Sequence, residues 1–155
     1  MIGKRTALAM VLSIALCRCA EPRYEIRHPT PLAGSLQTEK VSDCPTRFQN
    51  SGHCLLWRWE QKPTPSQAGS LVFKVVRANA LDDSPVPINL PGSPALVLWM
   101  PSMGHGSVPT AVDQVDIGSY RATNVFFIMP GEWELKFQFK NGSVINDEAV
   151  VTLLF

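Results

Sequence analysis

The segment LWMPSMGHGS, residues 98–107, carries side chains whose types and spacing are suited to metal chemistry. Met100 and Met103 lie three residues apart, and His105 follows between two glycines. Thioether sulfur is a soft, uncharged donor that suits Cu(I), and imidazole suits both oxidation states of copper. Met129, in FFIMPGEW, offers a third sulfur if its segment lies close to the first. These residues predict a copper site, with Cu(I) preferred, formed by Met100, Met103, His105 and Met129.

The same residues also have a simpler interpretation, in which they bind no metal. Methionine is an adaptable filler of irregular apolar gaps, and the rim of a β-sandwich needs apolar side chains. Short motifs of this kind have many false matches. The competing hypothesis is therefore a structural or protein-interaction module of the cell envelope. The two hypotheses differ in whether the four side chains converge on one point or splay apart.

Alternating apolar and polar residues predict the short strands that must position these side chains. In GEWELKFQFK the apolar residues fall on one face and the charged or polar residues on the other, as in a strand with one dry and one wet face. That apolar face consists of Trp133, Leu135, Phe137 and Phe139. Further apolar runs cover residues 55–60, 71–77, 95–100, 120–129 and 148–155. The pair Asn141-Gly142 predicts a hairpin between two of these strands.

The chain as a whole predicts an all-β fold. It contains 13 prolines and no persuasive helical periodicity, and its short apolar runs alternate with turn signals. We therefore expect an immunoglobulin-like β-sandwich of about seven strands, with residues 78–94 as a long crossover loop. In such a fold Met100 ends one strand, Met129 ends another, and the two strand ends meet at one rim. Trp99 points to the face opposite Met100.

The N-terminus predicts export. Lys4 and Arg5 precede an apolar run over residues 7–16, which is the pattern of a secretory signal peptide and is too short to span a bilayer, which takes about 20 residues. We expect a signal peptide over 1–19, a Pro-rich tether or irregular strap over 20–46 and the β-sandwich over 47–155. The expected location is periplasmic or secreted. Cys17 or Cys19 could instead be the lipidated residue of a lipoprotein, and a lipid anchor would then be the only attachment to the membrane.

Two cysteines remain after the signal peptide, Cys44 and Cys54. An even pair in an oxidising compartment most simply forms a disulfide. The alternative is a metal site made by Cys44, His53 and Cys54, for which the sequence offers no fourth ligand nearby.

Other functions find less support in the sequence. A net charge of +1 gives no basic stripe, so we expect no nucleic-acid partner. Ser102 and Ser107 flank His105 without an acidic residue to orient the histidine, so we expect no enzyme. The acidic pairs Asp82-Asp83 and Asp147-Glu148 are expected to be solvated turn or edge residues.

Two segments together resemble a known family. LWMPSMGHGS followed by YRATNVFFIMPGEWELKFQFKNG is similar to the YtkA-like/FixH-like family of small exported or membrane-tethered β-domains, and the resemblance covers residues 54–155. It implies an immunoglobulin-type sandwich related to CopC-type periplasmic copper-handling proteins. It also implies Met100, Met103, His105 and Met129 as copper ligands, and a copper-receiving protein of the cell envelope as partner.

Overall fold

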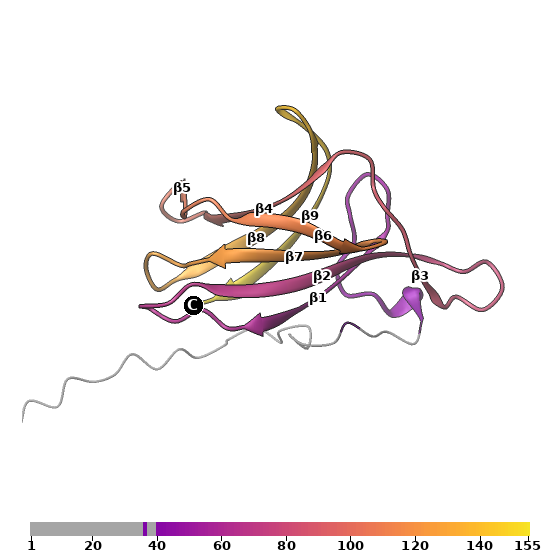
Figure 1. The fold of residues 1–155 in the computed structure, drawn as a ribbon, viewed down its shortest axis with the longest axis horizontal. Helices are drawn as coiled ribbons and strands as arrows, with labels where there is room; N and C mark the ends of the chain where they lie inside the picture. The colour runs from indigo at the N-terminus through magenta and orange to yellow at the C-terminus, as the bar shows by residue number, and fades with distance from the viewer. Residues whose placement is uncertain (1–35, 37–39) are drawn as a thin grey trace, which may run out of the picture.

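The computed structural model describes Leu36 and residues 40–155, which form a sandwich of two antiparallel sheets (Figure 1). The first sheet has the order β1-β2-β7-β6, with β3 paired to β2. Its strands are β1 (Cys54–Gln61), β2 (Gly69–Ala78), β3 (Pro85–Pro87), β6 (Ala111–Asp116) and β7 (Ser119–Val125). The second sheet has the order β5-β4-β8-β9. Its strands are β4 (Ser93–Met100), β5 (His105–Gly106), β8 (Glu132–Asn141) and β9 (Val144–Leu154). The all-β sandwich is confirmed.

The core lies between the two sheets and is organised by the inward face of β8. The four side chains of that face are completely buried, as the alternation predicts: Trp133, Leu135, Phe137 and Phe139. The ring of Phe137 reaches the facing sheet, where its centroid lies 6.1 Å from Trp57 and 5.1 Å from Phe73. Burying a side chain of this size contributes about 1.5–3 kcal/mol. This row therefore holds the two sheets together.

The hairpin predicted at Asn141-Gly142 is confirmed, with its loop one residue further along. Asn141 pairs with Val144, so that Gly142 and Ser143 form the connection between β8 and β9. Gly142 has a φ of 63° at the first loop position, where a type II′ turn requires a positive φ. The turn fixes the register of β8 against β9.

The strand predicted over 120–129 ends earlier, and the prediction that Met129 ends a strand is wrong. β7 stops at Val125, and the residue before it, Asn124, has a φ of 57°, a left-handed conformation that bends the strand at its end. The Asn124 side-chain amide donates a hydrogen bond of 2.7 Å to the carbonyl of Pro109, which holds this bend in place. Residues 126–131 consequently form an irregular segment that connects β7 in the first sheet to β8 in the second, and Met129 lies within it.

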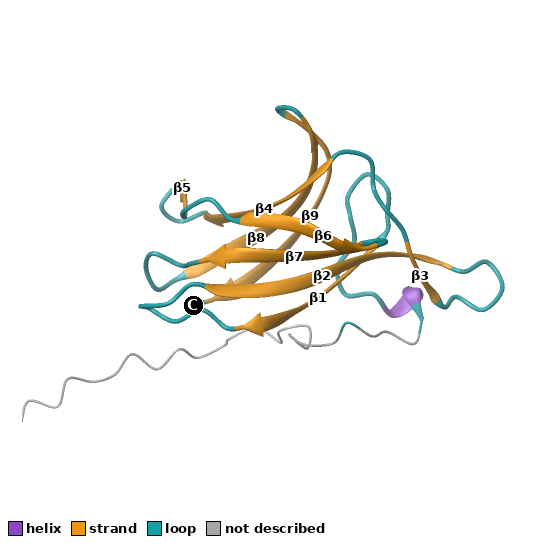
Figure 2. Cartoon of the chain, viewed as in Figure 1, coloured by secondary structure: helices purple, strands orange, loops and turns teal. Residues whose placement is uncertain are grey.

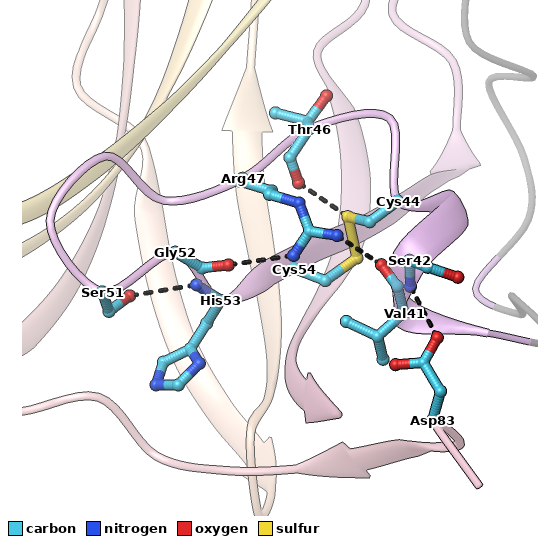
Figure 3. Close-up of a disulfide and its surroundings, with 10 residues drawn as sticks. All are labelled: Val41, Ser42, Cys44, Thr46, Arg47, Ser51, Gly52, His53, Cys54 and Asp83. Carbon is cyan, nitrogen blue, oxygen red and sulfur yellow. Dashed lines mark hydrogen bonds between the residues drawn. A yellow bond between two sulfur atoms is a disulfide. The ribbon is translucent and has the colours of Figure 1, made fainter. Parts of the chain in front are cut away.

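The predicted disulfide between Cys44 and Cys54 is confirmed (Figure 3). It joins the segment after the short 3-10 helix η1 (Val41–Asp43) to the first residue of β1. Because the two sulfurs are bonded to each other, and the imidazole of His53 points away from them (Figure 3), the alternative metal site of Cys44, His53 and Cys54 is wrong.

Residues 41–44 cover a second, smaller apolar cluster. Val41 and Cys54 are buried with Leu56 and Val76, which point away from the main core. The guanidinium of Arg47 ties this covering segment down by donating to the carbonyls of Val41 and Gly52 (Figure 3). The backbone N–H groups of Val41 and Ser42 also donate to Asp83, so the disulfide and several hydrogen bonds together hold the segment on the sheet.

Asp147 is buried, so the prediction of a solvated Asp147-Glu148 pair is wrong for its first member. Its side chain is 5% exposed. Its carboxylate accepts hydrogen bonds from the backbone N–H groups of Asn50, Ser51 and Glu148, at 2.9, 3.1 and 2.9 Å. Asp147 thus fixes the loop before β1 to the edge strand β9.

Part of the predicted organisation falls on residues that the structure does not describe. The signal peptide, with Cys17 and Cys19, lies outside the described residues, as does the tether up to residue 39 apart from Leu36. Over the described part of the chain, no helix has the length and apolar character needed to cross a membrane.

Replacing both Cys44 and Cys54 by alanine should lower the free energy of unfolding by about 2–3 kcal/mol, because the unfolded chain regains the freedom of the open loop. Urea denaturation followed by tryptophan fluorescence measures this change. The same titration on wild-type protein with reductant serves as the comparison. An unchanged midpoint in the double variant would show that the disulfide has no stabilising role.

Asp147→Asn should lower the free energy of unfolding by about 1–3 kcal/mol at neutral pH, because an amide N–H₂ then faces backbone donors. Burial raises the pKa of Asp147, but the hydrogen bonds from Ser51, Asn50 and Glu148 outweigh it and leave the pKa below its usual value of 3.8. A lowered pKa means that the carboxylate stabilises the fold above pH 3.8 and loses this effect as the pH falls further.

The difference between wild type and Asp147→Asn should therefore be constant above about pH 5 and shrink below it. Denaturant titrations at several pH values measure it. Asp113→Asn, at an exposed position of β6, is the matched control and should change stability by less than about 0.5 kcal/mol. A wild-type advantage that persists unchanged to low pH would contradict this role.

Candidate metal centre

The predicted ligands lie in two segments at one end of the sandwich, which we call the methionine rim (residues 100–107 and 126–131). The first segment contains the β4–β5 turn and β5, and the second joins β7 to β8. Figure 2 shows these loops at the end of the molecule where the C-terminus also lies. The crossovers that the sandwich requires bring both segments to the same rim, as the sequence predicts.

Met100 and His105 face each other across the pair of β4 and β5. They are direct register partners, so their side chains lie on the same side of this short ladder. The turn between them is tight, because the N–H groups of Met103 and Gly104 both donate to the carbonyl of Met100, at 3.2 and 3.0 Å. Met100 is 2% exposed and Met103 is 60% exposed. The two methionines of the motif therefore differ in depth, one in the core and one in solvent.

The second segment packs directly on the first. The terminal methyl carbon of Met100 lies 2.6 Å from the point where a Cβ on Gly131 would be placed, so the Met100 side chain packs directly on this glycine. Gly131 also has a φ of 146°, a conformation that side-chain-bearing residues rarely adopt. The Ser107 hydroxyl donates a hydrogen bond to the carbonyl of Phe126. The rim is thus cross-braced by an apolar contact and a hydrogen bond.

Trp133, the first residue of the buried row of β8, contacts both segments. Its indole N–H donates a hydrogen bond of 3.1 Å to the carbonyl of Met129. Its ring centroid lies 6.4 Å from that of His105, in an edge-to-face arrangement, and 5.4 Å from that of Phe127. One indole therefore contacts the imidazole of His105 and the backbone carbonyl of Met129.

Phe155 contacts the second segment of the methionine rim through both its backbone and its ring. Gly131 and Phe155 exchange two backbone hydrogen bonds, at 2.8 and 2.9 Å. The Phe155 ring lies 4.5 Å from that of Phe127, measured between centroids. The segment that carries Met129 is consequently held on both sides although it belongs to no strand.

Three of the four predicted ligands are at least half-buried in the rim, and the fourth, Met103, is at the surface. Met100 and His105 are register partners, whereas Met129 is linked to them through the hydrogen bond between its backbone carbonyl and Trp133. Met129 is half-buried against the main core, as is the ring of His105 against Trp133. Met103 extends from the turn into solvent. Trp99 points to the outer face of the sheet, as predicted, where the Lys136 ammonium lies 5.6 Å from its ring centroid.

The donors of the methionine rim are soft and neutral. The rim contains no Asp, Glu, Lys or Arg, so it lacks the carboxylate oxygens that Ca²⁺ and Mg²⁺ prefer. Among residues 40–155 no three His, Cys, Asp or Glu side chains are grouped so that they could hold a metal ion. The donors that the methionine rim offers are thus thioether sulfur and one imidazole, a chemistry that suits Cu(I).

The orientation of His105 suits a ligand. Its Nδ1 lies 3.1 Å from the carbonyl oxygen of Gly106. A carbonyl only accepts hydrogen bonds, so this contact requires the proton to be on Nδ1 and leaves the Nε2 lone pair unprotonated in the neutral ring. Metal-bound histidines commonly donate their second ring nitrogen to a carbonyl in this way.

Sequence reasoning missed the braces of the rim. The alternation of β8 assigned Trp133 to the core but gave no sign that its N–H reaches Met129. In the sequence Ser107 is only a near neighbour of His105, whereas in the structure its hydroxyl donates a hydrogen bond to the carbonyl of Phe126. A tryptophan two residues after a Met-Pro-Gly sequence was the signal available for the first of these roles.

Comparison with family models, with curated proteins and with solved structures finds no match to this chain. The resemblance to the YtkA-like/FixH-like family stays a prediction.

Ser107→Ala should lower the free energy of unfolding by about 1 kcal/mol, because the half-buried carbonyl of Phe126 loses its donor. Thermal and urea unfolding measure the change. Ser102→Ala is the matched control, since Ser102 is exposed in the β4–β5 turn. Equal free energies of unfolding for the two variants would show that the hydrogen bond from Ser107 to Phe126 does not stabilise the protein.

Proposed function

We propose that this protein binds copper, Cu(I) in preference, at the methionine rim and carries or delivers it in the cell envelope. The ligands are His105 through Nε2 and the thioethers of Met100, Met103 and Met129. The observation that carries the proposal is that the two segments lie against each other. Met100 and His105 are register partners in the first segment, and Trp133 contacts both the His105 ring and the backbone carbonyl of Met129 in the second. The Met100 side chain also packs against Gly131 of the second segment.

The donor set supports Cu(I) over other metals. Neutral thioethers and one imidazole add no negative charge, so they suit a singly charged soft ion better than hard divalent cations. Thioethers also bind without losing a proton and cannot be consumed by disulfide formation, in contrast to Cys44 and Cys54. A methionine site therefore keeps its ligands in the oxidising compartment where this disulfide can form.

The graded depth of the donors supports carriage rather than permanent storage. Met100 is buried, His105 and Met129 are half-buried, and Met103 is exposed to solvent. An exposed donor on a turn can exchange a metal with a partner, whereas a fully enclosed site retains it. The receiving protein would belong to the cell envelope and would present soft ligands of its own.

A metal-free interaction module is the second candidate, and one observation favours it. Several large apolar side chains are exposed at or beside the methionine rim: Met103 at 60%, Val108 at 42% and Ile128 at 44%. Apolar tips of this kind are typical of a contact surface. In this function the same loops would bind another protein without copper.

Titration of Cu(I) into the domain against a chromophoric competing chelator separates the two functions. We expect one-to-one binding, and an affinity at least about tenfold weaker in His105→Ala and in the double variant Met100→Ala/Met103→Ala, because each removes donors of the ion.

His53→Ala is the matched control, since His53 lies beside the disulfide and away from the rim (Figure 3). It should bind Cu(I) as the wild type does. A wild-type domain that takes no Cu(I) from the chelator would overturn the copper proposal and leave the interaction module.

A further inference from the structure

We infer that Trp133 is a positioning residue of the copper site: its indole sets the relative placement of His105 and Met129. The inference rests on the proposed function and adds a residue that the ligand set does not contain. It follows from two contacts that one side chain makes at once, an edge-to-face contact with His105 and a hydrogen bond to the carbonyl of Met129.

The two segments of the methionine rim have no shared backbone ladder, so side chains must set their spacing. β5 pairs with β4, whereas the segment of Met129 is bonded through Gly131 to Phe155. Trp133 bridges the two because it is the second residue of β8, which lies beside β4 in the same sheet. A shift of the indole would therefore change the distance between the imidazole of His105 and the backbone from which the Met129 side chain extends.

The indole itself is fixed in place. Trp133 is fully buried, and its ring lies against Phe127 on the core side. Its N–H bond to Met129 prevents the ring from rotating without leaving a buried donor unpaired. A core filler needs only the volume of the ring, which phenylalanine largely supplies. Filling this volume requires neither the hydrogen bond to Met129 nor the edge-to-face contact with His105.

Trp133→Phe isolates the hydrogen bond, because it keeps an aromatic ring at this position and removes the N–H donor. We expect Cu(I) affinity to fall about tenfold, as is typical when a residue that orients a metal ligand is changed. Phe137→Leu is the matched control: it alters the same buried face of the same strand, four residues from Trp133, where the ring packs against Trp57 and Phe73 of the facing sheet. It should lower stability and leave Cu(I) affinity unchanged.

The outcomes separate the inference from the proposed function. Weaker binding in Trp133→Phe with unchanged binding in Phe137→Leu supports positioning. Unchanged affinity in Trp133→Phe, or an equal loss in both variants, overturns it while the copper site stands. Failure of the wild type to bind Cu(I) removes the proposed function and the inference together.

A second measurement needs no substitution and holds if Trp133→Phe fails to fold. In ¹H–¹⁵N spectra of the wild type, the indole N–H resonance of Trp133 should shift when Ag(I), a redox-inert substitute for Cu(I), is added in one equivalent. The indole resonance of Trp99, on the outer face against Lys136, should stay in place and serves as the internal control. A Trp133 resonance that does not move while Ag(I) binds would overturn the inference.

Discussion

The packing of one face of β8 against the opposite sheet is the interaction on which the rest of the structure depends. A slip of one residue in this strand would bring Glu134 and Lys136 into the core in place of Leu135 and Phe137, so the register is strongly specified. Trp133 belongs to the same row and is buried by the same register. The position of its indole at the methionine rim is therefore set by the packing of the core. The fixed indole in turn restricts the positions of the residues that contact it.

The irregular segment 126–131 is stable because its backbone groups find partners outside any ladder. The carbonyl of Phe126 accepts from Ser107, that of Met129 accepts from Trp133, and Gly131 is bonded through both its N–H and its carbonyl to Phe155. Buried backbone groups left without such partners would cost more than the segment gains by packing. The same bonds restrict how far Met129 can move relative to His105, and a binding site gains affinity when its donors need no reordering.

How much of the molecule could be predicted from its sequence depends on the range of the interaction involved. The two-residue period of β8, the glycine of its hairpin and the disulfide leave local signals, and all three were predictable. The end of β7 and the burial of Asp147 left none, because they depend on partners far away in the chain. Asn124 bends toward Pro109, and Asp147 accepts hydrogen bonds from a loop about 97 residues earlier. The candidate site combines both cases: residue types indicated its donors, but the braces that connect them required the fold.

The two proposed functions use the same side chains. They differ in whether the Nε2 atom of His105 has a role. A contact surface needs the exposed apolar groups of Met103 and Ile128 but has no use for an unprotonated Nε2 on His105, whose ring is held by the Gly106 carbonyl and the Trp133 indole. A copper carrier needs both, since the metal must be bound and then passed to a partner across a close contact. Apolar tips around an exposed thioether exclude water from such a contact, and in a dry contact Cu(I) exchanges between sulfur ligands without passing through solvent. The features that favour the interaction module are thus also those that a delivery site requires. The contacts of His105 with Gly106 and Trp133 orient its ring in either function, and only the copper proposal assigns a role to its Nε2.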